Sequence, residues 1–309
     1  MNVCPITYEA CEGKYSPHGL RKLSRSLGQL QDLPYTAADQ IHEAAARAPK
    51  MSIQGVQPKL SAVLSVRRNR FAFVDTGGRY ILKPQHPQYR HLPENEDLSM
   101  RLAGAAGIPV PLHGLVYSKD GSMTYFIRRF DRVGRKKVAM EDFSQLMALS
   151  RDTKYDASME KVAQVVDRYC TFPAVEKIKL FRLTLLNFLI GNEDMHVKNF
   201  SLMTREGKVE LTPAYDLLNT TLVLPGEQEE IALPIKGKKR KLDSETLIDY
   251  FGRGRLGLNR TIVSSALDDF NAAMPLWDKL IGVSFLPDEM KAGYRSLLNN
   301  RRDRLFKYS

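Results

Sequence analysis

Three polar side chains near the middle of the sequence have the types and the order that phosphoryl transfer uses. Asp194 is followed five residues later by Asn199, and Asp216 follows a strand-like run at residues 208–211. A phosphotransferase needs one carboxylate to orient the attacking hydroxyl, and an amide oxygen and a second carboxylate to hold magnesium against the phosphates. We therefore expect Asp194 to be the catalytic base and Asn199 and Asp216 to be Mg²⁺ ligands. By itself, the spacing of Asp194 and Asn199 also fits an ordinary loop, in which both residue types are common.

The segments on either side favour the catalytic interpretation. Upstream, apolar residues recur at helical spacing over residues 175–190, and Gly191 ends the run. Downstream, residues 200–203 and 208–211 are predicted to form two short strands joined by a turn. Asp194 and Asn199 are thus expected in a loop between a buried helix and a hairpin. Protein kinases have their catalytic and metal-binding loops in the same order.

A lysine at the end of an upstream strand is a candidate for phosphate binding. Lys83 ends a predicted strand at residues 79–83, whose hairpin partner is at residues 71–74. Kinases keep the lysine that contacts the α and β phosphates at this place, although a lysine that ends a strand is usually only solvated. Glu94 and Glu96 open a predicted helix at residues 97–106. Either glutamate could pair with Lys83, and we favour Glu96.

The order of the predicted elements indicates the fold class. Strands are expected at residues 60–66, 71–74, 79–83, 113–117 and 123–128. Helices are expected at residues 159–169, 175–190, 244–250, 261–273 and 287–299. This order predicts an α+β, two-lobed protein-kinase-like fold with an antiparallel-sheet N-lobe, a mainly helical C-lobe and ATP between them. The predicted division is an N-terminal helical segment at 1–50, the N-lobe at 51–130 and the C-lobe at 131–309.

Several separated motifs, in the correct order, resemble those of the HipA-like serine/threonine kinases of bacterial toxin–antitoxin systems. They are SIQGVQPKLS at residues 52–61, YFIRRFDR at 125–132, NEDMHVKNFS at 192–201 and PAYDLL at 213–218. Residues 284–294 resemble the closing helices, so the resemblance extends from about residue 50 to the C-terminus. It implies a protein kinase that transfers the γ-phosphoryl group of ATP, with Mg²⁺, to a serine or threonine.

The resemblance also implies roles for individual residues. Residues 52–61 correspond to the phosphate loop, and residues 125–132 to the segment that links the lobes and meets adenine. The residues implied to bind the nucleotide are Gln54, Gly55, Val56, Gln57, Lys59, Lys83, Arg128, Phe130, Asp131, His196, Asn199, Tyr215 and Asp216. HipA itself has an acidic residue where Arg128 stands, but backbone groups can bind adenine whatever that side chain is.

Ser52 stands where the family has a regulatory serine that the kinase phosphorylates itself. A phosphate there would add negative charge and acceptor oxygens that compete with ATP for the loop amides. Judged by pattern alone, a serine in a loop is more often a turn or cap residue. HipT kinases often have a second serine two residues later, where this chain has Gln54.

The phosphate loop begins about fifty residues into the chain, whereas full-length HipA kinases have a further N-terminal subdomain. This pattern resembles HipT, the kinase toxin of tripartite HipBST systems, in which the small protein HipS resembles the missing piece. The resemblance therefore implies as partners a HipS-like protein and a HipB-like helix-turn-helix antitoxin, with operator DNA bound only within the complex. It implies an aminoacyl-tRNA synthetase as the substrate, with the tryptophanyl type favoured.

Composition and charge agree with a globular nucleotide-binding protein. The 309 residues carry a net charge of +11, which favours polyanionic partners, and 43% of them are hydrophobic. The basic run at residues 236–241 is either a solvated loop or a contact for DNA backbone. No long apolar stretch or secretory signal is evident, so we expect a cytoplasmic protein that does not enter membranes.

The three cysteines give no disulfide framework, because they are few and scattered. Cys4 and Cys11, with His18, have no usual zinc-site spacing, and we do not expect a metal there. Two other functions stay open. One is a small-molecule phosphotransferase similar to aminoglycoside kinases, and the other is a non-catalytic partner of a DNA-bound antitoxin.

Overall fold

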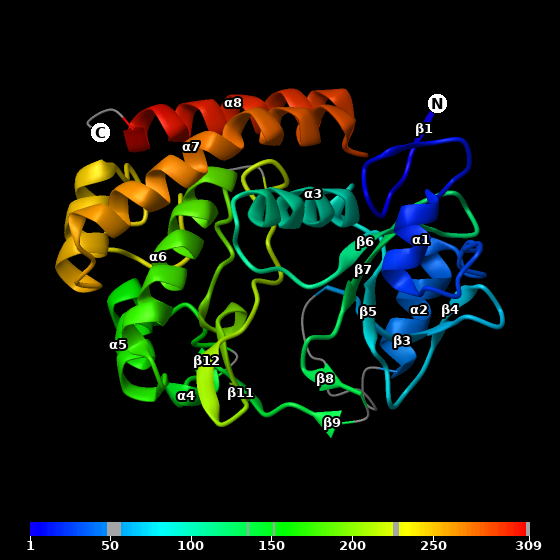
Figure 1. The fold of residues 1–309 in the computed structure, drawn as a ribbon, viewed down its shortest axis with the longest axis horizontal. Coiled ribbons are helices and arrows are strands. Elements are labelled where there is room, and N and C mark those ends of the chain that lie inside the picture. Colours follow the sequence, from blue (N-terminus) through cyan, green and yellow to red (C-terminus); the bar gives the residue numbers. More distant parts are fainter. Residues whose placement is uncertain (48–56, 135, 151, 225–228, 307–309) are drawn as a thin grey trace. The chain divides into compact units, whose positions relative to one another are not determined.

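The computed structural model describes residues 1–47, 57–134, 136–150, 152–224 and 229–306. The chain divides into two compact units, each with its own core. The first comprises Met1–Leu98, Pro111–Phe130 and Gly282–Leu286, and the second comprises Ser99–Val110, Asp131–Ile281 and Pro287–Ser309. The predicted α+β class is confirmed, since the first unit contains an antiparallel sheet and the second is mainly helical (Figure 1).

Five antiparallel strands form the sheet of the first unit in the order β4-β3-β5-β7-β6. Their bounds are β3 Leu60–Ser65, β4 Arg70–Phe73, β5 Tyr80–Lys83, β6 His113–Tyr117 and β7 Met123–Arg128. Each lies within one residue of its predicted position, because alternating apolar positions and turn residues mark the strands clearly. Gly77, in the turn between β4 and β5, has a φ of 71°, a conformation that glycine adopts without a Cβ penalty.

The alternation of side chains decides which face of the sheet Lys83 occupies. Leu82 is opposite Phe126 in the register, and both belong to the buried core on one face. Lys83 is opposite Tyr125, so both side chains point to the other face. The lysine therefore lies away from the apolar core although it is itself buried.

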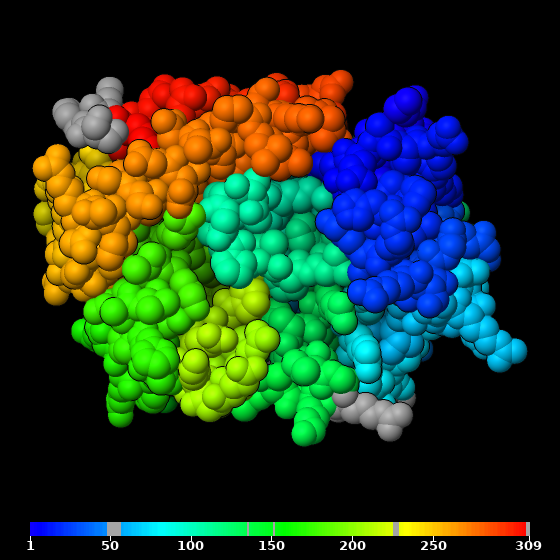
Figure 2. Space-filling model, viewed as in Figure 1, coloured from blue at the N-terminus to red at the C-terminus, as the bar shows by residue number. Residues whose placement is uncertain are grey.

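The N-terminal residues complete the core of the first unit. They form β1 Asn2–Val3, β2 Ala10–Cys11, α1 Pro17–Leu23 and α2 Ala37–Arg47. Leu20, Leu33 and Ala44 belong to the same buried cluster as Leu60 and Leu82 of the sheet. In the space-filling view the blue N-terminal residues lie directly against cyan residues of the same unit (Figure 2). This segment therefore covers one face of the sheet.

Helix α3 spans Leu92–Ala105 and begins earlier than the predicted start at residue 97. The predicted bound was too late, although Glu94 and Glu96 were expected to open the helix. Pro93 stands in the first turn, where a proline lacks only a hydrogen bond that would be unmade anyway. Glu94 and Glu96 consequently lie on the helix itself, and so does Asp97.

The second unit contains most of the helices and a small three-stranded sheet. Its other helices are α4 Phe143–Leu146, α5 Met159–Tyr169, α6 Pro173–Ile190, η2 Val197–Asn199, η3 Glu245–Arg255, α7 Arg260–Val283 and α8 Asp288–Phe306. Its sheet has the order β10-β11-β12, with bounds Met140–Asp142, Ser201–Arg205 and Lys208–Leu211. A two-stranded ribbon, β8 Arg132–Val133 with β9 Lys136–Lys137, also belongs to this unit. The predicted turn at Glu206 and Gly207 is present, with φ values of 51° and 75°.

Two helices of the second unit differ from their predictions. Helix α7 continues past the predicted end at residue 273 and through Pro275, because buried Phe270 and Trp277 lie on either side of the proline in one apolar stripe. The indole N–H of Trp277 also donates to the carbonyl of Leu102 at 2.9 Å. The helix predicted at 244–250 is present as the longer π-helix η3.

Close packing of η3 requires a glycine. A Cβ on Gly252 would lie 2.7 Å from the ring of Phe181 on α6, a contact that real side chains do not make. Periodicity alone could not distinguish this helix from an ordinary α-helix, because π-helices are rare and have no simple sequence signature. In the part of the chain that the structure describes, no helix is both long and apolar enough to span a bilayer.

Candidate active site

Hydrogen bonds of two side-chain amides hold the loop that follows α6. Gly191 ends the helix with a φ of 74°, and Asn192 then donates from Nδ2 to Oδ1 of Asn187 at 2.9 Å. The amide oxygen of Asn192 in turn accepts the main-chain N–H of Asp194 at 3.2 Å. Both asparagines are buried, so these bonds form away from water. The helix end thereby fixes the position of Asp194.

Asp194 presents its carboxylate at the surface of this loop. Its side chain is 48% exposed, and His196 Nε2 lies 3.8 Å from Oδ1. The hydroxyl of Tyr155, from the segment before α5, donates to the same oxygen. A carboxylate that is accessible and already accepts a hydrogen bond from a hydroxyl has the chemistry of a general base for an alcohol.

The imidazole ring of His196 is buried beside the loop and is neutral at pH 7. Burial lowers the pKa of His196, although the charges of Asp194 and Asp216 act in the opposite direction. The ring meets the ring of Tyr155 edge to face, with centroids 5.2 Å apart. Nδ1 is buried and makes no hydrogen bond within the described residues. His196 therefore supports the loop by packing beside the carboxylate.

Asn199 is tied to the backbone of Asp194. Its Nδ2 donates to the Asp194 carbonyl at 3.0 Å, so the amide oxygen points away from that bond. Asn199 ends the short helix η2, and its own N–H donates to the carbonyl of His196. The structure thus joins the predicted base and the first predicted metal ligand in one turn.

Asp216 lies on a segment that closes back onto the catalytic loop. Its φ of 54° is unusual for a residue with a side chain, and such conformations are concentrated at functional sites. Next to it, the Tyr215 hydroxyl bonds to Ser201 Oγ at 2.6 Å and donates to the Lys198 carbonyl at 3.2 Å. Burial raises the pKa of the Tyr215 phenol, so it stays protonated.

The donor atoms of Asn199 and Asp216 fit a magnesium ion. An amide oxygen and a carboxylate are hard ligands of the kind that Mg²⁺ takes together with water and substrate phosphates. No group of three or more His, Cys, Asp and Glu side chains arranged to hold a metal by themselves occurs among the described residues. A kinase site does not require one, because the nucleotide supplies ligands too.

In the first unit, Lys83 forms a buried ion pair. Lys83 Nζ lies 2.5 Å from Glu96 Oε1, with side chains that are 2% and 0% exposed. The ammonium also lies 5.6 Å from the centre of the Tyr125 ring. The predicted partner Glu96 is confirmed, while Glu94 accepts hydrogen bonds from Gln85 at 2.8 and 3.0 Å.

The residue after Glu96 on α3 forms a second buried pair. Asp97 Oδ1 is 2.8 Å from His113 Nδ1 on β6, and the His113 ring lies 5.9 Å from that of Tyr125. Adjacent residues of the helix thus bind two different strands of the sheet. This arrangement fixes the first half of α3 against the face that holds Lys83.

Residues 52–56 of the predicted phosphate loop, which include Ser52, Gln54, Gly55 and Val56, lie outside the described residues. Gln57 and Lys59, which follow them, are half-buried before β3. Arg128 is exposed at the end of β7, and its main-chain N–H donates to the Leu112 carbonyl at 2.7 Å. The Asp131 carboxylate accepts a hydrogen bond from Arg132, and Phe130 before it is half-buried. The nucleotide-binding roles of these residues stay predictions.

Several residues that shape the site could not be predicted from the sequence. Tyr155 lies far from Asp194 along the chain, in a turn-rich segment without a periodic pattern. Thr220 and Thr221 donate to the Gly191 carbonyl and contact Glu193, as side chains that a motif search does not single out. Only the fold brings these groups to the catalytic loop.

Comparison with known proteins gives the family. Residues 51–277 match the family described as the HipA-like C-terminal domain. The chain belongs to this family. A putative kinase of Haemophilus influenzae is 28% identical over 86% of this HipA-like chain and 86% of its own length. The putative kinase Y4dM of Sinorhizobium fredii is 30% identical over 80% of this chain and 64% of its own length.

A third relative and two solved structures extend the comparison. The serine/threonine-protein kinase toxin HipA of Shewanella oneidensis is 28% identical over 74% of this chain and 56% of its own length. The solved complex of Shewanella oneidensis HipA with HipB and operator DNA matches 91% of this chain and 74% of that chain, with 23% identity and a TM-score of 0.69. The proinflammatory kinase CtkA of Helicobacter pylori matches with 15% identity and a TM-score of 0.57, over 84% of this chain and 96% of that one. The predicted kinase-like fold is therefore confirmed.

The basic run of this HipA-like chain is partly neutralised by acidic neighbours. Lys236 Nζ lies 3.6 Å from Glu245, and Lys239 Nζ lies 3.1 Å from Glu229. Lys236 and Gly237 form a tight turn closed by the bridge between Ile235 and Lys238. These contacts favour the interpretation of this run as a structured surface loop.

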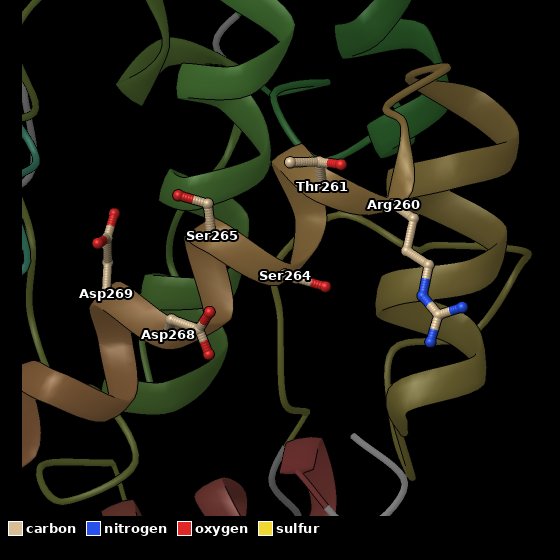
Figure 3. A pocket seen from close by; sticks show the side chains of 6 residues that line it. All are labelled: Arg260, Thr261, Ser264, Ser265, Asp268 and Asp269. Atoms are coloured by element: carbon tan, nitrogen blue, oxygen red, sulfur yellow. The ribbon is translucent and has the colours of Figure 1, made fainter.

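Elsewhere, His18 and the cysteines have other contacts. His18 Nδ1 lies 2.8 Å from Glu9 Oε1, and all three thiols are buried. A shallow hollow of about 480 Å³ lies along α7 and is open to solvent. Figure 3 shows the hydroxyls of Thr261, Ser264 and Ser265 and two aspartates on successive turns of that helix. None of the predicted site residues lines it.

Proposed function

We propose that this chain is an ATP-dependent serine/threonine protein kinase that acts as the toxin of a bacterial toxin–antitoxin system. The observation that carries the proposal is the buried pair of Lys83 and Glu96, which joins a strand to a helix. Protein kinases use a pair of this kind to hold the lysine that contacts the phosphates of ATP. The relatives named as kinases support the same activity.

The energetics of the pair also favour a functional role. Removing two charges from water costs several kcal/mol per ion, and replacing a buried pair by apolar side chains is often neutral or stabilising. A fold therefore has little reason to bury Lys83 and Glu96 for stability alone. A lysine held in a fixed position beside a carboxylate suits the binding of an anionic ligand.

In the proposed mechanism, Asp194 orients the hydroxyl of the acceptor and receives its proton as the oxygen attacks the γ-phosphorus. The bond from the γ-phosphorus to the bridging oxygen breaks, and ADP leaves. Asn199 and Asp216 would hold Mg²⁺, which neutralises negative charge on the phosphates. Lys83 would contact the phosphates from the first unit. His196 and Tyr215 keep the loop in place through the contacts described above.

The remaining parts of the nucleotide site follow from the motif resemblance. Backbone amides at residues 54–56, with Gln57 and Lys59, are proposed to contact the phosphates. Arg128, Phe130 and Asp131 are proposed to border adenine. Ser52 is the proposed site of autophosphorylation, where a phosphate would occupy the loop in place of the nucleotide phosphates.

The target and the partners are proposals on the same basis. An aminoacyl-tRNA synthetase, tryptophanyl in type, is the proposed substrate, and a HipB-like antitoxin with a HipS-like protein would be the neutralising partners. The Shewanella HipA complex contains HipB and operator DNA, which supports an antitoxin partner of that kind. A cytoplasmic location would bring kinase and synthetase together.

The kinase proposal is tested by intact-mass spectrometry of the purified chain before and after incubation with ATP and Mg²⁺. Peptide mapping of any added phosphate would show whether Ser52 carries it. Asp194→Asn should reduce incorporation by on the order of 10² or more, since a positioned base contributes about 10² to 10⁴. Removal of Mg²⁺ with a chelator should also abolish it.

A second assay offers tryptophanyl-tRNA synthetase and, separately, small alcohols as acceptors. Phosphate on the synthetase supports the proposed target, whereas phosphate on the alcohols alone indicates a small-molecule phosphotransferase. Equal incorporation by the wild type and by Asp194→Asn would show that Asp194 is not the base. No transfer to any acceptor, together with no self-modification, would favour a non-catalytic partner of the antitoxin.

A further inference from the structure

The Tyr155 hydroxyl is hydrogen-bonded to the carboxylate oxygen of Asp194 that an acceptor hydroxyl would need. Its hydroxyl donates a hydrogen bond to Oδ1 of Asp194, within the second unit. The same donation, from alcohol to carboxylate, is what the base must receive from a serine or threonine before transfer. The Tyr155 hydroxyl thus has the chemistry of the attacking group but belongs to the protein itself.

We propose that Tyr155 closes the acceptor position of the kinase and must be displaced by the acceptor hydroxyl before transfer. The proposal rests on the proposed kinase function and makes Tyr155 a specificity-determining residue of the same site. With the phenol in place, Oδ1 of Asp194 already accepts a hydrogen bond, so water must displace the phenol to use this oxygen as the base. Only an acceptor that binds the protein well enough to displace the phenol reaches it.

The surroundings of Tyr155 hold the ring beside the base. The ring meets His196 edge to face, at an angle of 81° between planes and with centroids 5.2 Å apart. Lys154 Nζ lies 4.8 Å from the ring centre, and the Lys154 carbonyl accepts the N–H of Val197 at 3.4 Å. The segment before α5 is therefore attached to the catalytic loop by its backbone as well.

The side chain of Tyr155 can also be displaced from Asp194. Its side chain is not part of the apolar core, since the residue is 39% exposed. The hydroxyl makes this one hydrogen bond among the described residues, so the acceptor has a single polar contact to replace. Burial and the hydrogen bond to Asp194 both raise the pKa of the phenol. At neutral pH the group is therefore a neutral donor, and its departure leaves no buried charge behind.

Water is the acceptor that tests the proposal without knowledge of the natural target. In hydrolysis, a water oxygen bonds to the γ-phosphorus, the bond to the bridging oxygen breaks and ADP leaves. The proton of the water passes to Asp194. Removing the phenolic hydroxyl should open Asp194 to water and raise the rate of ATP hydrolysis. If Tyr155 merely supported the loop, its substitution would lower that rate.

The experiment measures release of inorganic phosphate from ATP and Mg²⁺ by the full chain, with no protein acceptor added. We expect Tyr155→Phe to raise the rate about tenfold or more, because a hydrogen bond to a charged group commonly shifts an equilibrium by that factor. Tyr155→Ala should do the same. The double variant Tyr155→Phe with Asp194→Asn should lose the gain, which would show that the water reacts through the base.

Tyr169→Phe is the matched control, because its hydroxyl makes no hydrogen bond among the residues that the structure describes. Equal melting temperatures of the variants would establish that they fold alike. If the wild type phosphorylates itself but Tyr155→Phe releases phosphate no faster, the closing role of Tyr155 is wrong and the kinase proposal stands. If no variant transfers phosphate to itself, to water, to the synthetase or to the small alcohols, the kinase proposal fails and the role of Tyr155 fails with it.

Discussion

The charged ammonium group of Lys83 is buried. Its side chain is 2% exposed, and the Glu96 carboxylate lies 2.5 Å away as the counter-charge. Glu94, two residues earlier on α3, has different neighbours, namely Gln85 and, at 3.7 Å, His91. The two glutamates therefore offer a direct comparison between a carboxylate that neutralises Lys83 and one that does not.

Glu96→Gln should lower the free energy of unfolding by about 3–5 kcal/mol, because breaking one side of a buried pair leaves an uncompensated charge. It should also raise the ATP concentration needed for half-maximal transfer, since Lys83 loses the group that positions it. Urea denaturation and the mass-spectrometric transfer assay measure the two effects. Glu94→Gln is the control. If both variants lose stability equally, the pair has no special role.

The residues of the site differ in how far the sequence could predict them. Asp194, Asn199 and Asp216 could be proposed from the sequence because a kinase base and its metal ligands belong to short segments with a fixed order. Glu96 was found because a helix follows the strand of Lys83. The contact of Tyr155 with Asp194 depends on how α5 and the catalytic loop meet in space, and no local pattern encodes that.

At the scale of single elements, the end of α6 decides where the catalytic loop begins. Gly191 has a φ of 74°, and a Cβ there would lie 2.5 Å from Leu297 and 2.8 Å from Thr221. Gly207, in the turn between β11 and β12, has a φ of 75°, but nothing lies within 4 Å of the place its Cβ would take. The two glycines share the conformation and differ in the space around them.

Gly207→Ala should destabilise the chain by about 1–2 kcal/mol, the cost of a left-handed conformation for a residue with a side chain. Gly191→Ala should cost clearly more, because Leu297 and Thr221 must also move. It should reduce phosphoryl transfer too, since the loop that carries Asp194 starts there. Urea denaturation of both variants checks the difference. Equal losses would show that the crowding at Gly191 relaxes without cost.

Whole elements were predicted best where their ends are marked by turn residues. The strands His113–Tyr117 and Met123–Arg128 and the helix Met159–Tyr169 match their predictions to the residue. The predictions were wrong where tertiary packing overrides a local signal. Pro275 does not end α7 because the apolar stripe continues past it, and η3 forms where Gly252 lets it approach Phe181.

At the scale of the whole molecule, two cores have to form. The core of the first unit is shared between residues far apart in sequence, since Leu33 of the N-terminal segment packs with Leu82 and Phe126 of the sheet. The N-terminal residues therefore contribute to the unit that contains Lys83. A defect in this segment should affect nucleotide binding without touching the catalytic loop.

Leu33→Ala should lower the free energy of unfolding by about 2–5 kcal/mol, because Leu33 is 1% exposed and its loss leaves a cavity. Leu276→Ala is the control on α7, where the side chain is 47% exposed and little should change. Thermal unfolding followed by circular dichroism measures both. A Leu33→Ala protein as stable as the control would mean that the N-terminal segment adds nothing to the core.

The chain has a single tryptophan, and the fold has placed it where it serves as a built-in optical probe. Trp277 is 1% exposed and its indole is bonded to the Leu102 carbonyl, both in the second unit. Tryptophan emission will therefore report the loss of packing around α7 alone. Circular dichroism, in contrast, follows both units, and a difference between the two melting curves of Leu33→Ala would resolve the unfolding of the first unit from that of the second.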